Sequence, residues 1–534
     1  MSEPLFRIAL ASALAILAGL PLVAPGRRPA AGDLAAAWTL ALGNAAVLAL
    51  AAGLLGLRLS PPALLLLLAA PGVAVAVLGR AAHREPESGA SGGSGDPAGR
   101  GSDPAGRGGD FAVRGSDPPA GRGPDHAGSG SDPAGSGSDL AGSGNDLAAA
   151  AGAPRAARAL LAASTVALAC ALAALAVKLV RAPLWSWDHF AIWGVKARSM
   201  LAGGHLRLDF LRSLYQTRTD HPLGVPMAWL VLTLGEAPSP AVFKLLHALF
   251  ALALVAVLWT AVRRATSSPA LANAATAFLA VSPLLWDSEA VGLVEVPLAL
   301  WAMASLLPAP PAAPAASHCR PCRPWVAGLA LGFLPWIKQE GLVLSLLLLA
   351  VALPPTLRAR RGGSGATATV ALLCAPALAL MTGALAVQKL VLPPGASFFL
   401  GHWWRSGLDR LPLLMDIQRR CLSLLLQPDW LGFWIVLAAL TVVALARRHR
   451  MALAMFAIVW VQVLVYELTA VVTYLPPLAH LDASFFRICA ALVPIGLLGM
   501  AMLSRPRLQK LAESFGSLPD FMTQAELRRM REDA

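Results

Sequence analysis

Long apolar runs alternate with short polar segments along most of the chain. The runs are rich in Ala and Leu and are not interrupted at every second position, which argues against a membrane β-barrel. A helix needs roughly 20 mostly apolar residues to cross the hydrocarbon of a bilayer. The pattern therefore predicts an all-α, polytopic membrane protein with about thirteen transmembrane helices. We place them near residues 7–25, 35–57, 61–79, 157–180, 239–262, 269–286, 290–308, 324–337, 341–355, 367–391, 431–447, 451–474 and 485–504.

Two segments depart from this alternation. Residues 82–150 repeat a Gly-Ser-Asp-Pro-Ala-Gly theme and lack the apolar content that offsets the entropy of ordering, so they predict a disordered linker. The stretch 222–235 is apolar but short, which favours a juxtamembrane or re-entrant helix. The predicted organisation is an N-terminal group of three helices (1–80), the linker (81–155), a membrane domain (156–505) and a tail (506–534).

Composition supports the membrane class. The chain is 57% hydrophobic and only 14% charged, with a mean hydropathy of +0.63, whereas a soluble protein of this length needs more charge on its surface. The net charge of +13 comes from basic clusters in short loops, which mark the cytoplasmic side and argue against nucleic-acid binding. This rule places the linker and the tail in the cytoplasm and the N-terminus outside. The clusters are Arg27-Arg28, Arg155/Arg158, Arg263-Arg264, Arg358/Arg360/Arg361, Arg447-Arg448 with Arg450, and Arg505/Arg507/Lys510.

The cysteines give no firm metal site. Most of the six lie in or beside apolar runs, where buried thiols are ordinary packing residues. His318, Cys319 and Cys322 have the spacing of half a zinc site, but a second pair of ligands is missing. We therefore expect no metal and no other cofactor, while a divalent metal is not excluded. The first apolar run resembles a signal peptide, but two more runs follow closely, which favours a retained anchor.

The first outer loop of this topology combines tryptophans with charged residues. Trp187, Ala191 and Lys196 roughly follow helical spacing, which predicts an amphipathic helix lying at the membrane interface. The alternative is a belt of interfacial tryptophans with incidental charges. That alternative leaves Asp188 unexplained, since an acid at a membrane boundary is costly without a role or a partner.

Further polar residues fall in the other outer loops. His221 is either a proton carrier or a capping residue, and Glu295 lies inside an apolar run, where an acid is a functional candidate. Lys338 and Glu340 lie in the turn between two apolar segments, which needs no charge for its own sake. Arg487 stands at the start of the last predicted helix, either as part of a site or as an interfacial arginine that reaches the lipid headgroups.

These residue types point to chemistry on a phosphate held at the membrane surface. Two cations such as Lys338 and Arg487 suit a phosphate at the level of the lipid headgroups. A carboxylate such as Asp188 suits a general base. Together they predict a reaction on a lipid-linked phosphate, with the reaction type left open by the residues alone.

Several segments resemble bacterial membrane glycosyltransferases of the GT-C superfamily, which are relatives of the protein O-mannosyltransferases and of the lipid A aminoarabinose transferase. The resemblance spans residues ~157–505. The resembling segments are Trp187-Asp188 with Trp193 and Lys196-Ala197; His221-Pro222-Leu223-Gly224-Val225-Pro226, without the family's tyrosine; Glu295-Val296-Pro297-Leu298-Ala299-Leu300, with Glu for the family's Asp; Ile337-Lys338-Gln339-Glu340-Gly341, with Gln for Asn; and Ser484-Phe485-Phe486-Arg487 followed by Pro494.

The resemblance implies a GT-C-type bundle with a juxtamembrane helical loop on the outer face, in a bacterial inner membrane. It implies transfer of a sugar, with inversion, from a polyprenyl phosphate to a hydroxyl of a lipid, glycan or protein on the outer face. Asp188 would be the catalytic base, and Lys338 and Arg487 would bind the donor phosphate. Supporting or substrate-binding roles would fall to Trp187, Lys196, His221, Glu295 and Glu340.

Two other functions remain open from the residues. A transporter or lipid flippase would use Glu295, Lys338 and Arg487 as an ion or headgroup pathway, but no internal repeat with matching broken helices is evident. A non-catalytic membrane protein would leave the outer charges free to change. The longer arms of Glu295 and Gln339, relative to the family pattern, also fit either a specialised donor pocket or an inactive member.

Overall fold

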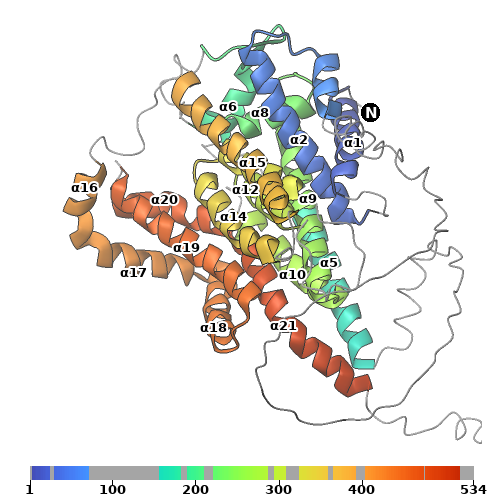
Figure 1. The fold of residues 1–534 in the computed structure, drawn as a ribbon, viewed down its shortest axis with the longest axis vertical. Helices are drawn as coiled ribbons and strands as arrows, with labels where there is room; N and C mark the ends of the chain where they lie inside the picture. The colour runs from blue at the N-terminus through green and yellow to red at the C-terminus, as the bar shows by residue number, and fades with distance from the viewer. Residues whose placement is uncertain are drawn as a thin grey trace, which may run out of the picture. The chain divides into compact units, whose positions relative to one another are not determined.

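A computed structural model describes residues 3–23, 29–70, 155–181, 189–209, 221–286, 294–307, 324–358, 365–392, 403–473 and 476–516. Nearly all of them are helical (Figure 1). The helices of the first half are α1 (Glu3–Val23), α2 (Ala31–Leu54), α5 (Arg155–Arg181), α6 (Gly194–Ser199), α8 (Gly224–Leu232), α9 (Pro240–Thr266), α10 (Pro269–Val281), α11 (Pro283–Trp286) and α12 (Glu295–Leu306). Those of the second half are α13 (Pro324–Ile337), α14 (Gly341–Arg358), α15 (Gly365–Ala386), α16 (Trp403–Arg410), α17 (Leu414–Leu425), α18 (Phe433–Ala446), α19 (Arg450–Val472), α20 (Pro477–Ala490) and α21 (Val493–Gly516).

The remaining elements are short. The single turns η1 (His189–Trp193) and η3 (Val387–Val391) are π-helical, and η4 (Leu411–Leu413) and η5 (Pro428–Trp430) are 3₁₀-helical. Strands β1 (Leu201–Ala202) and β2 (His205–Leu206) pair antiparallel as a small hairpin directly after α6.

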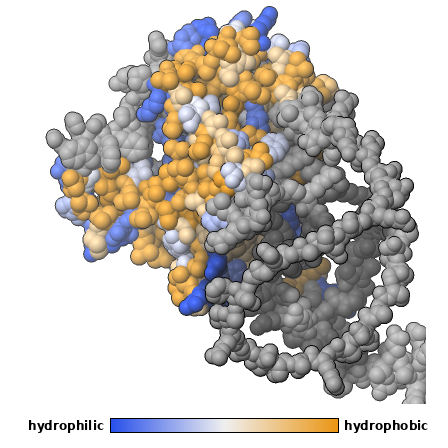
Figure 2. All heavy atoms as spheres, viewed as in Figure 1, coloured by the Kyte–Doolittle hydropathy of each residue, from blue (hydrophilic) through white to orange (hydrophobic). Residues whose placement is uncertain are grey.

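Within the described residues, six helices are long and apolar enough to cross a membrane, and α20 with α21 makes a seventh if this pair, bent by 45°, is one span. The six segments are Glu3–Leu20, Ala31–Leu54, Arg158–Arg181, Pro240–Thr266, Thr367–Val391 and Arg450–Val472. Among the coloured residues of Figure 2, apolar side chains make up most of the visible surface. The chain is therefore an all-α, polytopic membrane protein. The predicted number of thirteen spans goes beyond this, because the other apolar helices have only 10–17 residues.

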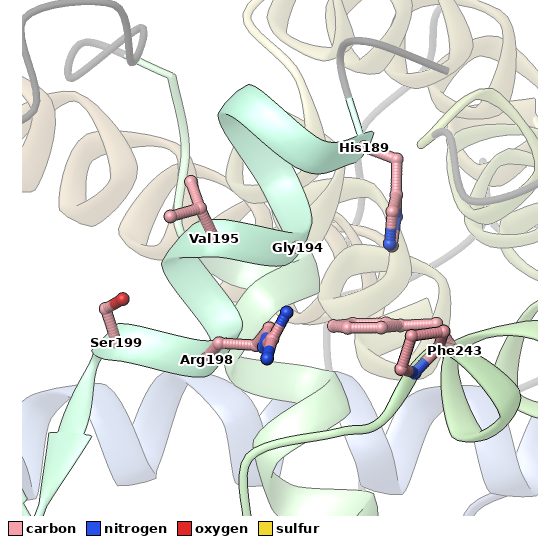
Figure 3. Close-up of a pocket in the computed structure, with 7 residues that line it drawn as sticks. His189, Gly194, Val195, Arg198, Ser199 and Phe243 are labelled. Atoms are coloured by element: carbon pink, nitrogen blue, oxygen red, sulfur yellow. The ribbon is translucent and has the colours of Figure 1, made fainter. Parts of the chain in front are cut away.

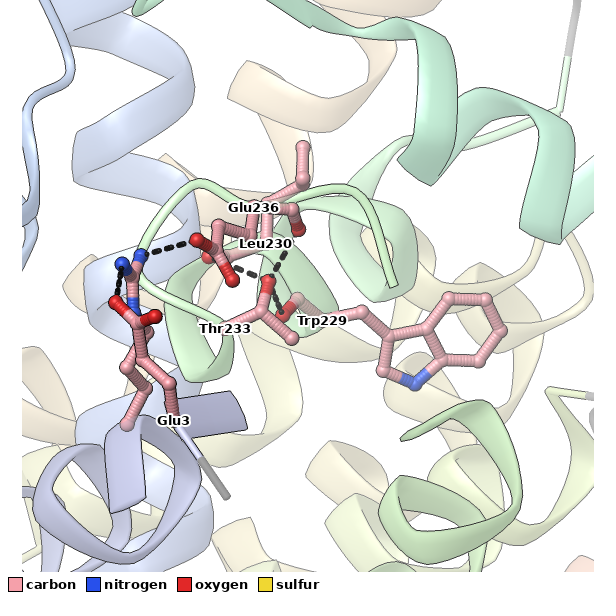
Figure 4. Close-up of polar contacts among 6 residues, drawn as sticks. Glu3, Trp229, Leu230, Thr233 and Glu236 are labelled. Atoms are coloured by element: carbon pink, nitrogen blue, oxygen red, sulfur yellow. Dashed lines mark hydrogen bonds and ion pairs between the residues drawn. The ribbon is translucent and has the colours of Figure 1, made fainter. Parts of the chain in front are cut away.

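The N-terminal helices belong to the same packed unit as the rest of the described chain. Helix α2 packs against α1, α8 and α9. Asp33, which is fully buried at the start of α2, accepts two hydrogen bonds from Arg264 of α9, at 2.6 and 2.7 Å. Arg7 lies near the start of α1. It forms an ion pair with Glu236, which follows α8, at 2.8 Å, and another with Glu3 at 2.6 Å (Figure 4). Two ion pairs thus tie the first helices to the predicted membrane domain.

Small residues let two helices of the centre approach closely. A methyl group on Gly328 of α13 would run into the carbonyl oxygen of Leu373 on α15, and one on Gly332 would meet Leu380 at 2.6 Å. Close helix contact over small residues is typical of membrane bundles. There the hydrophobic effect does not drive helices together, because lipid tails are as apolar as the side chains, and close packing takes its place. This contact fixes α13, and so the turn after it, which holds Lys338.

Three predicted segments differ from the structure in extent or fall outside it. Helix α21 runs past the predicted end of the membrane domain at 505, to Gly516. The stretch 222–235 contains the short helix α8, and all nine of its residues are buried. Most of the predicted linker, residues 81–154, lies outside the described residues.

Candidate functional site

A buried cluster of charged residues lies where α12, α13 and α14 meet. Glu295 is the first residue of α12, and Lys338 follows the end of α13. The Lys338 Nζ atom donates a hydrogen bond to Glu295 Oε1 at 3.1 Å and lies 3.7 Å from Glu340 Oε1. The side chains of Lys338, Glu295 and Glu340 are 11%, 5% and 26% exposed, so the cluster opens on the side of Glu340.

The tight turn between α13 and α14 places Lys338. Its amide donates to Leu334 O at 3.2 Å, and its carbonyl accepts from Gly341 N at 2.9 Å. Position 341 must be glycine because any side chain would collide with the carbonyl oxygen of Leu334. The sequence Lys-Gln-Glu-Gly therefore folds into a compact turn that points its lysine back toward α12.

Arg487 of α20 adds a second positive charge to this cluster. It is half-buried and interacts electrostatically with both Glu295 and Lys338. Burial lowers the pKa of the Lys338 ammonium, but Glu295 and Glu340 more than offset that effect, so its pKa is raised overall. Lys338 therefore stays charged in an apolar surrounding. The structure brings together four residues, Glu295, Lys338, Glu340 and Arg487, from three separate segments of the sequence.

Two residues of α19 extend the cluster and were missed by the sequence analysis. Gln462 is fully buried, and its Nε2 atom donates to Glu340 O at 3.5 Å. Tyr466 is one turn further, is also buried, and its hydroxyl interacts electrostatically with Glu340 and Glu295. The available signal was a pair of polar residues four apart within an apolar helix, which place both on one face.

A pocket of about 370 Å³ lies beside the first loop (Figure 3). The Arg198 guanidinium extends toward the Phe243 ring, and the His189 ring points toward that ring from the other side of the pocket. The centroids of His189 and Phe243 are 4.5 Å apart in an edge-to-face arrangement. Histidine and arginine supply polar groups on an aromatic wall, which suits a polar ligand. The pocket is lined by His189, Gly194, Val195, Arg198, Ser199, Pro240 and Phe243.

His247 of α9 lies between this pocket and the charged cluster. It follows Phe243 by one turn, is buried, and interacts electrostatically with both His189 and Glu295. The sequence analysis did not single it out, because a lone histidine within an apolar run is usually a packing residue. Polar groups therefore run from the pocket into the centre of the bundle.

Lys196 and His221 form a separate contact. The Lys196 Nζ atom is buried and donates to the carbonyl oxygen of His221 at 3.0 Å, and the rings of Trp193 and His221 are 5.3 Å apart. The predicted amphipathic helix is instead η1 followed by α6, with Lys196 directed inward and not toward a membrane surface. Three residues beyond His221, Gly224 abuts the carbonyl oxygen of Trp336, close to Lys338 in sequence.

The remaining predicted groups cannot be placed. Trp187 and Asp188 lie outside the described residues, directly before His189. Cys319, Cys322 and His318 also lie outside them. Among the described residues, no group of three or more His, Cys, Asp or Glu side chains could hold a metal ion.

Comparisons with known proteins add no relative. No protein-family model matches the chain, no curated protein matches it, and no solved structure matches it.

Proposed function

We propose that this chain is a membrane glycosyltransferase that moves a sugar from a polyprenyl phosphate to an acceptor hydroxyl. The observation that carries the proposal is the convergence of Lys338 and Arg487 on two carboxylates inside an apolar bundle. Ionisable groups buried in a membrane protein are costly and are retained for function. The resemblance of these segments to GT-C glycosyltransferases gives the reaction type.

The donor phosphate would bind at the open side of the cluster. Glu340 is the most exposed of the three charged side chains in the Lys338 ion pairs, and Arg487 is half-buried. A phosphate entering there would meet two cations, which stabilise negative charge more effectively in a dry site than in water. Glu295 would hold the Lys338 ammonium in place before the phosphate arrives.

The acceptor would occupy the pocket of His189 and Arg198. Asp188 directly precedes His189 in the sequence, which supports placing the general base at this pocket. The Asp188 carboxylate would take the proton of the acceptor hydroxyl as its oxygen attacks the anomeric carbon. The bond from that carbon to the phosphate would break, and its electron pair would go to the phosphate oxygen beside Lys338 and Arg487, with inversion at the carbon.

The setting of the proposed enzyme is a bacterial inner membrane, with the site on the outer face. The full number of thirteen spans would require the shorter apolar helices, which have 10–17 residues, to cross the membrane as well. The short helices would cross as parts of broken spans or where the bilayer is locally thinned.

The test is sugar transfer by the purified full chain with a panel of undecaprenyl-phosphate hexoses. Lipid-linked sugars from cells with and without the protein would first identify the donor, which should accumulate in its absence. Asp188→Asn should abolish transfer while membrane insertion is unchanged, and full activity in this variant would exclude Asp188 as the base. Arg487→Ala should weaken use of the donor more than use of the acceptor. Arg419→Ala, at an arginine 76% exposed on α17, is the matched control and should leave both unchanged.

A lipid flippase or transporter is the second candidate. The observation in its favour is the 45° bend between α20 and α21, because transporters build their sites at broken helices. Translocation of undecaprenyl phosphate in vesicles without any transfer would favour it over the enzyme.

A further inference from the structure

Three oxygen atoms of the charged cluster are buried without a hydrogen bond to any described residue. They are Glu295 Oε2, Gln462 Oε1 and the hydroxyl oxygen of Tyr466. Each belongs to a side chain that is more than nine-tenths buried. Buried polar atoms without a partner destabilise a fold, so a group that supplies one is expected.

The three oxygens belong to one place in the bundle. Gln462 and Tyr466 are four residues apart and share a face of α19. That helix packs against α14 and α20. The Gln462 amide nitrogen donates to Glu340 O, which leaves its carbonyl oxygen as an acceptor. The Tyr466 hydroxyl interacts with Glu340, with the Gln462 side chain and with Glu295.

The set is dominated by hydrogen-bond acceptors. A carboxylate oxygen and an amide oxygen accept only, whereas the tyrosine hydroxyl both donates and accepts. A ligand group here must therefore bring hydrogen-bond donors and no negative charge.

We infer that Glu295, Gln462 and Tyr466 form the subsite for the transferred sugar and select one that offers hydroxyl or ammonium donors. This inference rests on the proposed function, in which the phosphate lies at Lys338 and Arg487. Neutral hexoses and amino sugars fit the subsite. A uronic acid does not, because its carboxylate would face the oxygens of Glu295 and Gln462 in a dry site.

The test measures binding of five lipids to the full chain in nanodiscs. The probes are undecaprenyl phosphate, its neutral hexose derivatives with glucose, galactose and mannose, and its glucuronate derivative. The wild-type protein should bind at least one neutral hexose lipid about tenfold more tightly than the bare phosphate lipid, the effect of one good hydrogen bond. The glucuronate lipid should bind no better than the bare phosphate lipid.

Two substitutions test the residues. Tyr466→Phe, which removes only the hydroxyl, and Gln462→Leu should each remove about tenfold of the affinity for the preferred hexose lipid, without changing the affinity for undecaprenyl phosphate. Thr469→Val is the control on the same helix, because its hydroxyl donates to Val465 O within α19. It should leave both affinities unchanged.

The outcomes separate this inference from the proposed function. If undecaprenyl phosphate itself does not bind, the proposed function fails and the inference falls with it. If the bare lipid binds but no hexose lipid gains affinity, or both substitutions leave the hexose gain intact, the inference alone is wrong. In that case the three oxygens are satisfied by internal water.

Discussion

The ion pair between Lys338 and Glu295 gives a quantitative prediction about stability. Replacing Glu295 by Gln removes the carboxylate 3.1 Å from the ammonium and leaves Glu340 at 3.7 Å as its remaining partner. At an effective dielectric constant of about 20, the attraction at 3.1 Å is about 5 kcal/mol and the attraction at 3.7 Å is about 4 kcal/mol. The cost of taking the charges out of water offsets a large part of both.

The two carboxylates should therefore contribute unequally. Removing one partner of a buried pair typically costs about 3–5 kcal/mol, and Glu340 keeps the loss for Glu295→Gln near about 3 kcal/mol. Glu340→Gln should cost about 1 kcal/mol or less, because this side chain is 26% exposed and too far from Lys338 for a hydrogen bond. The combination Glu295→Gln with Lys338→Met should regain part of the loss, since it also removes the buried ammonium that Glu295→Gln leaves short of a partner.

Equilibrium unfolding in mixed SDS micelles, followed by tryptophan fluorescence, measures these values in a double-mutant cycle. The coupling energy between Glu295 and Lys338 should be about 2 kcal/mol and should exceed that between Glu340 and Lys338. Equal losses for the two single carboxylate variants, or a coupling energy near zero, would show that Lys338 is not held as the structure has it.

Three further variants test the packing. Asp33→Asn should cost about 3 kcal/mol in the same assay, because it breaks a buried pair with Arg264 that has hydrogen bonds to both oxygens, and a stability equal to wild type would refute that contact. Gly328→Ala should cost about 1–3 kcal/mol, because the added methyl group would push α13 away from Leu373 on α15. Gly383→Ala should cost less, because the nearest atom to its methyl group is a Trp336 ring atom at 3.3 Å. The reverse order would contradict the α13–α15 contact. Lys196→Met keeps the apolar part of the side chain but removes the hydrogen bond from the ammonium to His221 O. We expect a loss of about 1–2 kcal/mol in apparent unfolding free energy. No loss would mean that this hydrogen bond does not stabilise the fold.

The positions of the helices were visible in the sequence, but their neighbours were not. The segments Arg158–Arg181 and Pro240–Thr266 have the same mean hydropathy of 2.4, yet 17% of the first and 61% of the second are buried inside the bundle. Lipid chains and protein interiors are both apolar, so hydropathy does not distinguish a helix facing lipid from one facing other helices. For the same reason the sequence did not indicate that α2 would pack against α8 and α9.

The charged part of the candidate site was predictable, and the uncharged part was not. Glu295, Lys338 and Arg487 are conspicuous because charge in or beside an apolar run is rare. Gln462 and Tyr466 are less costly in a membrane helix, and their spacing of four residues shows only that they share a face of α19. Only the packing of α19 against α14 and α20 brings them to Glu340.

Contacts between helix ends show whether the pocket and the charged cluster lie at the same end of the bundle, which a single reaction requires. Lys244, near the start of α9, donates to the carbonyl oxygen of Val180 at the end of α5, at 2.6 Å. At the opposite end of α9, Arg264 binds Asp33, which lies in the first turn of α2. Helix α9 therefore runs antiparallel to both α5 and α2. The pocket includes Pro240, at the α9 end near Val180, and Gly224 and Trp336 connect that end to the turn of Lys338. Under the proposed function, donor and acceptor would therefore meet at this one end of the helices, whereas a flippase would need a path to the end where Asp33 lies.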